Sequence, residues 1–220
     1  MSKTGFLESL ATIYGTELSQ ALIQPRTLPL VPTIQLFLLV DDYPKNSLGL
    51  EAYQKLMAAP PYWAFCWGGG QALALHVLAN PRCVPGRTVI DFGAGSGVAG
   101  VAAALAGAAR VICVDIDPLA LQSAAANGEL NQVELEVAEA YRSGPDDLIL
   151  AADVCYEEAG MAYLKAHLSQ GGNAIIADSR VEQMTQKVET IVQVSECQAK
   201  TFPDLDEADC FNYVRLYTSI

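Results

Sequence analysis

A glycine-rich loop is the segment of this 220-residue chain best suited to bind a ligand. Residues 91–97 read Asp-Phe-Gly-Ala-Gly-Ser-Gly and follow a short apolar run that predicts a buried β-strand. Alternating glycines let the backbone turn sharply and let a ligand approach more closely than a Cβ atom would permit. Because ligands of open α/β sheets bind at the carboxyl ends of the strands, this loop is a candidate ligand site.

The carboxylate of Asp91 narrows the class of ligand. Residues 95–100 match the dinucleotide pattern Gly-x-Gly-x-x-Gly, so a nicotinamide cofactor is one alternative. That pattern starts late after the strand, however, and Asp91 would repel a diphosphate. A negative charge at this point suits a cationic ligand, such as the amino group and sulfonium of S-adenosylmethionine. The loop therefore favours S-adenosylmethionine over a nicotinamide cofactor.

A second carboxylate, Asp115, ends the next apolar run. A carboxylate there can accept hydrogen bonds from both ribose hydroxyls, and since both cofactor classes carry a ribose it does not discriminate between them. Ile116 is placed to pack on an adenine face, and Glu139, after the third predicted strand, to accept from the exocyclic amine; a solvated loop residue is an equal alternative for Glu139. Asp117 is expected to be the N-cap of a helix that starts at Pro118.

The fourth predicted strand ends at Ala152 and is followed by Asp153 and Tyr156. A carboxylate and a phenol three residues apart at the end of a strand both point toward the reacting centre of a bound cofactor. The only two tryptophans, Trp63 and Trp67, lie just before the strand–helix region. For Trp63 we favour core packing, and for Trp67 a place at the cofactor. The two histidines, at positions 76 and 167, have no partner in the sequence and are not expected to be catalytic.

Together these segments resemble the seven-strand protein methyltransferases of the Asp-x-x-Tyr lysine branch, in particular the electron-transfer-flavoprotein β-subunit lysine methyltransferases. The likeness covers roughly residues 31–156 and thins beyond them. Two positions depart from the family pattern: Glu157 stands where Asp is usual, and Cys66 and Gly68 flank Trp67 where Trp-Pro-Gly is expected. The matching segments are residues 32–36, 61–64, 69–73, 115–118 and 129–131.

The resemblance implies an S-adenosylmethionine-dependent N-methyltransferase that modifies lysine on a protein. Asp153 would orient the amine that accepts the methyl group, and Tyr156 would direct its lone pair. The residues expected to bind the cofactor, by analogy or from the reasoning above, are Trp67, Asp91, Gly93, Ala94, Gly95, Gly97, Asp115, Ile116, Glu139 and Ala152.

Strands that alternate with helices must position these residues, which predicts a doubly wound, Rossmann-like, seven-strand α/β sheet. The last two strands, 188–200 and 211–218, are joined only by an acidic loop and are expected to form an antiparallel hairpin. The other strands are predicted at 88–91, 111–115, 133–137, 147–152 and 173–177, and the helices at 98–106, 118–130 and 157–168.

An appendage is expected before this domain. Residues 6–23 have helical periodicity, prolines 25, 29 and 32 should interrupt regular structure, and residues 33–40 favour a strand. We therefore divide the chain into an appendage, 1–60, that packs on a methyltransferase domain, 61–220.

The net charge of −12 disfavours nucleic acid and favours a cationic partner such as a lysine-bearing protein surface. Six cysteines without a Cys-x-x-Cys pair predict no metal site and a reducing cytoplasm, and without a signal or bilayer-spanning segment we expect a soluble protein with no membrane partner. Alternatives to protein lysine methylation are N-methylation of a small nicotinamide-like amine, an NAD-dependent oxidoreductase, and a non-catalytic cofactor-binding protein.

Overall fold

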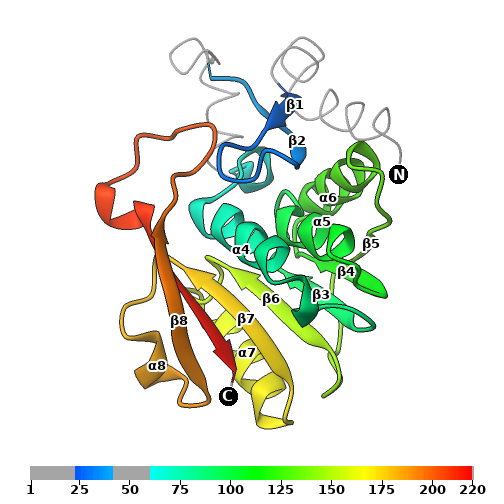
Figure 1. Cartoon of the computed structure of the whole chain (residues 1–220). Coiled ribbons are helices and arrows are strands. Elements are labelled where there is room, and N and C mark those ends of the chain that lie inside the picture. Colours follow the sequence, from blue (N-terminus) through cyan, green and yellow to red (C-terminus); the bar gives the residue numbers. More distant parts are fainter. Residues whose placement is uncertain (1–22, 42–59, 220) are drawn as a thin grey trace.

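The computed structural model describes residues 23–41 and 60–219, which form a seven-strand sheet covered by helices and a separate two-strand sheet (Figure 1). The order of the large sheet is β5-β4-β3-β6-β7-β9-β8. Its strands are β3 (Thr88–Phe92), β4 (Arg110–Val114), β5 (Glu136–Ala138), β6 (Leu148–Ala152), β7 (Asn173–Asp178), β8 (Ile191–Gln198) and β9 (Tyr213–Ser219). The expected doubly wound fold is confirmed.

The first five strands of this sheet are parallel, whereas β9 is antiparallel to both β7 and β8. Two reversals leave β8 parallel to β7, so that the carboxyl end of β8 lies at the same edge of the sheet as the ends of the parallel strands. The antiparallel hairpin predicted for the end of the chain is therefore confirmed.

Helices cover both faces of the sheet (Figure 1). On one face α4 (Gly68–Ala79), α5 (Val98–Leu105) and α6 (Pro118–Leu130) pack in a single apolar cluster with Leu148 and Leu150 of β6. On the other face α7 (Glu158–Ser169) packs with Ile149 of the same strand, and α8 (Met184–Lys187) contributes Met184. The alternation along β6 is the period of two that a strand buried on both faces requires. Short 3-10 turns occur at Tyr62–Ala64, Pro81–Cys83 and Asp209–Asn212.

The third predicted strand was placed too early, because pairing starts at Glu136 rather than at residue 133. Val133 donates its N–H to the carbonyl of Gly128, and Leu135 packs against that glycine. Residues 133–135 thus wrap around the end of α6 before β5 begins and pairs with β4. The short helix α8 was not predicted.

The segment before the main sheet forms a hairpin of β1 (Ile23–Thr27) and β2 (Gln35–Leu39). The expectation that Pro25 interrupts regular structure is wrong, because Pro25 lies inside β1 opposite Phe37. The N–H of Phe37 points away from β1 and donates to Asn127 Oδ1 at 2.7 Å. Pro25 therefore occupies a non-hydrogen-bonded pair, where its missing N–H weakens no ladder bond.

The strand predicted at 33–40 is confirmed as β2, which packs against α6. The helix predicted over 6–23 lies outside the described residues except for Ile23, which begins β1. The division of the chain at residue 60 stays a prediction. Within the described ranges, the helices are too short or too polar to cross a bilayer.

Candidate active site

The candidate residues gather at the carboxyl edge of the parallel strands. The glycine loop follows β3, Asp115 follows β4, Asp153 follows β6, and residues 199–212 follow β8 at the same edge. Residues far apart in the sequence thus meet where ligands of open α/β sheets bind.

The glycine loop combines two tightly packed glycines with one that faces open space. Gly93, Gly95 and Gly97 all have positive φ, at 68°, 51° and 74°. A Cβ on Gly93 would strike Val154, and one on Gly97 would lie 2.8 Å from Ala124 Cβ, whereas one on Gly95 would meet no atom within 4 Å. The loop is therefore held at both ends and open at Gly95. A cofactor has room to approach there.

Asp115 is joined directly to this open point. Its Oδ2 accepts the N–H of Gly95 at 2.9 Å, and its Oδ1 accepts the N–H of Asp117 at 3.0 Å. Burial raises the pKa of Asp115. Each oxygen keeps lone-pair capacity for a further donor such as a ribose hydroxyl. Asp117 in turn caps α6 through the N–H of Leu119, as predicted.

An apolar surface flanks Asp115. Ile116 is 86% exposed, and Val137 of the neighbouring strand β5 is 42% exposed. Glu139 is exposed beyond the end of β5. We call the hydrogen-bonded pair of Gly95 and Asp115, together with Ile116, the cradle. Because Ile116 is almost wholly exposed, its side chain provides an apolar surface on which an adenine ring could pack. The residues present thus fit an adenosine-containing cofactor.

Asp91 caps the N-terminus of helix α5. Gly97, the N-cap residue, has no side chain with which to cap, and Asp91 Oδ2 accepts the N–H of Gly100 at 2.8 Å instead. Asp91 is 3% exposed, and burial raises its pKa to about 7. Its predicted role toward the amino group of the cofactor stays a prediction, because the hydrogen bonds that the structure gives it come from the helix and from the thiol of Cys113. Ala94 is also buried in this loop.

Asp153 caps the N-terminus of helix α4 in the same way. Trp67, the N-cap residue of α4, makes no side-chain cap, and Asp153 Oδ2 accepts the N–H of Gly69 at 2.8 Å. Asp153 Oδ1 accepts from the N–H and the hydroxyl of Ser179, at 2.8 and 2.9 Å. Asp153 has φ 51°, and burial raises its pKa. A Cβ on Gly69 would strike the carboxylate, which explains the glycine there. Ala152 is half-buried at the end of β6.

Aromatic side chains surround this carboxylate. Trp67 donates its indole N–H to the carbonyl of Tyr62 at 3.0 Å, and the two rings lie 5.7 Å apart between centroids. Tyr62 and Tyr156 are each 56% exposed, whereas Trp63 is 2% exposed and lies in the core. Burial and the neighbouring acidic Glu157 raise the pKa of Tyr156. Trp67 and Tyr156 are thus brought to one region with Asp153.

Four residues that the sequence did not predict as site residues also lie here: Ser179, Arg180, Glu207 and Phe211. The first two belong to the segment 177–180, to which the resemblance thins beyond Tyr156, and Glu207 belongs to the acidic loop predicted between the last two strands. Elsewhere His167 is buried, with Nδ1 3.0 Å from Ser143 Oγ and Nε2 3.0 Å from the Asn173 carbonyl. Over 23–41 and 60–219, no group of three or more His, Cys, Asp or Glu side chains is arranged to hold a metal ion.

The chain is similar in sequence to known methyltransferases. The human electron transfer flavoprotein beta subunit lysine methyltransferase is 37% identical over 134 residues, 59% of this chain and 50% of that protein. The ribosomal protein L11 methyltransferase of Dichelobacter nodosus is 34% identical over 145 residues, 63% of this chain and 49% of that protein. The chain therefore spans about half the length of the curated relatives that it matches. The predicted resemblance is confirmed.

The fold has solved counterparts as well. The N-methyltransferase NodS from Bradyrhizobium japonicum WM9, crystallised with S-adenosylhomocysteine, superposes with a TM-score of 0.50 at 14% identity, covering 68% of this chain and 84% of that one. The family model for ribosomal protein L11 methyltransferase (PrmA) matches residues 68–201, which hold the glycine loop, Asp115 and Asp153. Because this match spans more than half of the chain, the protein belongs to the ribosomal protein L11 methyltransferase (PrmA) family.

Proposed function

We propose that this protein transfers a methyl group from S-adenosylmethionine to a lysine of a protein, with the β subunit of electron transfer flavoprotein as the acceptor. The observation that carries the proposal is the cradle in which Gly95, open toward solvent, donates its N–H to Asp115 beside the exposed Ile116. The family match and the human relative support the reaction and the acceptor.

The cofactor would be held by the residues around that cradle. Asp115 would accept the ribose hydroxyls, Ile116 would pack on the adenine, and Glu139 would accept from its amine. The glycine loop, Trp67 and Ala152 would surround the methionine part. When bound, S-adenosylmethionine supplies an activated methyl carbon, whose bond to sulfur breaks as its bond to the lysine nitrogen forms, leaving S-adenosylhomocysteine.

The acceptor amine must be neutral when it reacts. Lysine has a reference pKa of about 10.4, and a partly desolvated, aromatic-lined site lowers it. Asp153 Oδ2 accepts one hydrogen bond, from Gly69, and keeps a lone pair that can orient the amine through a charge-assisted hydrogen bond. Tyr156, half in solvent, would direct the nitrogen lone pair, and the proton would pass to water.

Ribosomal protein L11 is a second candidate acceptor, because the matching family model carries that name. A cytoplasmic location is part of the proposal and is supported by six free cysteines. The division of the chain into an appendage, 1–60, and a methyltransferase domain, 61–220, is also part of the proposal. A net charge of −12 favours a protein over nucleic acid as partner. Membership of a methyltransferase family disfavours the oxidoreductase alternative.

Tritiated-methyl labelling tests the proposal. The full chain is incubated with labelled S-adenosylmethionine and, in separate reactions, human electron transfer flavoprotein β subunit, ribosomal protein L11 or nicotinamide, and the labelled products are analysed by mass spectrometry. We expect label on lysine of the flavoprotein subunit. Label only on L11 would assign the second acceptor, and label only on a small amine such as nicotinamide would replace the protein acceptor. Calorimetric binding of NAD but not of S-adenosylhomocysteine would refute the methyltransferase assignment.

A further inference from the structure

Arg180 contacts two aromatic rings at the edge of the candidate site. Its guanidinium carbon lies 5.4 Å from the centroid of the Trp67 ring and 4.3 Å from that of Phe211. The guanidinium also pairs with Glu207 Oε1 at 2.5 Å, and the two side chains are only 22% and 15% exposed. Arg180 thus contacts two rings and has its charge paired with Glu207, so this side chain is not free to bind an acidic ligand.

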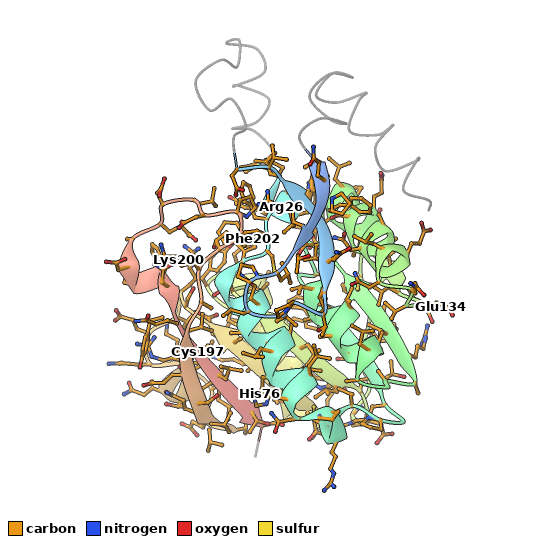
Figure 2. The ribbon with its side chains drawn as sticks, turned by 45° about the horizontal axis from the view of Figure 1, so that its top comes forward. Arg26, His76, Glu134, Cys197, Lys200 and Phe202 are labelled. Atoms are coloured by element: carbon orange, nitrogen blue, oxygen red, sulfur yellow. The ribbon has the colours of Figure 1, made fainter. Side chains whose placement is uncertain are left out.

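The partners of Arg180 lie on the connection between β8 and β9, residues 199–212. Its start is fixed by reciprocal backbone hydrogen bonds between Cys66 and Phe202, at 2.7 and 2.8 Å. Figure 2 shows Phe202 beside Arg26, whose guanidinium lies 4.9 Å from the ring centroid, and both are far from Glu134. Farther along, Glu207 joins Arg180 to Thr201, whose hydroxyl donates to its Oε2 at 2.5 Å. Arg180 therefore fastens the distal part of the connection.

The turn that carries Arg180 also positions Asp153. Asp178 Oδ1 accepts the N–H groups of Arg180 and Val181, at 2.7 and 2.6 Å, and so shapes the turn after β7. Ser179, between them, donates twice to Asp153 Oδ1. The turn of residues 178–180 thus contacts two elements: Ser179 holds the carboxylate of Asp153 after β6, and Arg180 holds Glu207 on the β8–β9 connection.

We propose that Arg180 is a positioning residue that holds the connection 199–212 as the acceptor-facing wall of the methyl-transfer site. This rests on the proposed function and adds to it the element that meets the protein substrate. The wall lies at the cofactor edge of the sheet and exposes Asp206 and Asp209, which suit a cationic, lysine-bearing segment. The proposed contacts of the ribose and the adenine, Asp115, Ile116 and Glu139, lie after β4 and β5, away from the wall; Trp67 is the one proposed cofactor residue that Arg180 contacts.

Steady-state kinetics of Arg180→Met, Arg180→Lys and the control Arg110→Met test this, with human electron transfer flavoprotein β subunit as the probe. Arg110 forms an exposed ion pair with Glu136 at the start of β4, away from the site. For Arg180→Met we expect KM for the protein to rise about tenfold, and the Kd of S-adenosylhomocysteine to rise by less, about threefold, because only its contact with Trp67 reaches the cofactor site. Arg180→Lys should restore part of the loss, because it keeps the charge but not the planar stacking.

An unchanged KM in Arg180→Met, or an equal loss of cofactor affinity, would overturn the proposal. Limited digestion with endoproteinase Asp-N gives a readout that needs no acceptor and uses cleavage before the exposed Asp206 and Asp209, in the distal part of the connection. We expect cleavage there to be about fivefold faster in Arg180→Met than in Arg110→Met, since a loosened segment opens more often. Equal cleavage rates in the two variants would contradict the positioning role of Arg180. Absence of methylation by the wild-type protein would refute the proposed function, and the cleavage rates would still test the positioning role. Should Arg180→Met not fold, Phe211→Leu, which removes one stacking face, takes its place with the same expected results.

Discussion

Asp153 Oδ2 accepts the N–H of Gly69 at 2.8 Å, which joins the end of β6 to the first turn of α4 across 84 residues of sequence. Asp91 does the same for α5 through Gly100. Both helices begin at residues that provide no side-chain cap, Trp67 and Gly97. Two carboxylates at the candidate site are therefore also structural, because each satisfies an N–H that the helix leaves without a partner.

Asp153→Ala should abolish methyl transfer and also destabilise the fold. The substitution leaves the buried N–H groups of Gly69 and Ser179 without their acceptor, which costs about 2–4 kcal/mol in the free energy of unfolding. Urea denaturation measures the loss, and calorimetry with S-adenosylhomocysteine should show little change in cofactor affinity at a temperature where the variant is folded. Ser179→Ala, which removes only the hydroxyl donor, is the control and should lose less. Wild-type stability of Asp153→Ala would contradict the capping role.

Gly95→Arg should block the cofactor site without unfolding the protein. Its matched control is Gly107→Arg, because Gly107 also has positive φ and open space for a Cβ atom but lies between α5 and β4, away from the site. Both variants should lose about 1–2 kcal/mol from the left-handed backbone conformation. Titration with S-adenosylhomocysteine should show no binding by the first and normal binding by the second. Normal binding by Gly95→Arg would place the cofactor elsewhere.

Asp91→Asn should alter how stability depends on pH. Burial raises the pKa of Asp91 from 3.8 to about 7. Between about pH 4 and 7 the folded state therefore keeps a proton that the unfolded state has released, and this group makes the protein less stable as pH rises. Asparagine keeps an oxygen for the N–H of Gly100 and does not ionise. The stability of the variant relative to wild type should increase from pH 5 to pH 8, by at most about 1.4 kcal/mol per pH unit. A constant difference in urea denaturation across this range would show that Asp91 does not titrate there.

Asp209→Lys should weaken the protein acceptor and leave the cofactor unaffected. Asp209 is exposed on the β8–β9 connection, and Glu134 is exposed at the opposite end of the sheet, so Glu134→Lys makes the same change in net charge at a distance (Figure 2). We expect KM for the flavoprotein subunit to rise about threefold to tenfold at low salt for the first variant alone, with the effect fading at high ionic strength. Equal effects of both variants would indicate a response to net charge only.

Asn127→Leu should be strongly destabilising. Asn127 is fully buried, accepts the N–H of Phe37 at 2.7 Å and donates to the carbonyl of Ser96 at 2.8 Å, so it ties β2 to the glycine loop. Leaving these groups unpaired should cost about 2–4 kcal/mol, measured by thermal or urea unfolding. Asn131→Leu, whose bonds to Gln35 are exposed, should cost less than about 1 kcal/mol. A larger loss for Asn131 would refute this order.

Much of the main sheet followed from the sequence alone, because local rules govern it. Apolar runs between helical segments predicted the parallel strands, and a short acidic connection predicted the final hairpin. Asp117 before Pro118 predicted a helix start that the structure places at the same residue. The alternating glycines predicted the ligand loop, since only glycine readily adopts positive φ there.

What only the tertiary structure decided is which distant groups meet. Pro25 is tolerated in β1 because Phe37 turns its N–H toward Asn127, a residue of α6 that no local pattern connects to it. Asp91 and Asp153 cap helices, and Arg180 contacts both Trp67 and Phe211, which are separated by 144 residues. Such partners carry no local signal in the sequence, because hydrogen bonds and ring contacts between remote residues depend on how whole elements pack, not on the propensities of the residues next to them.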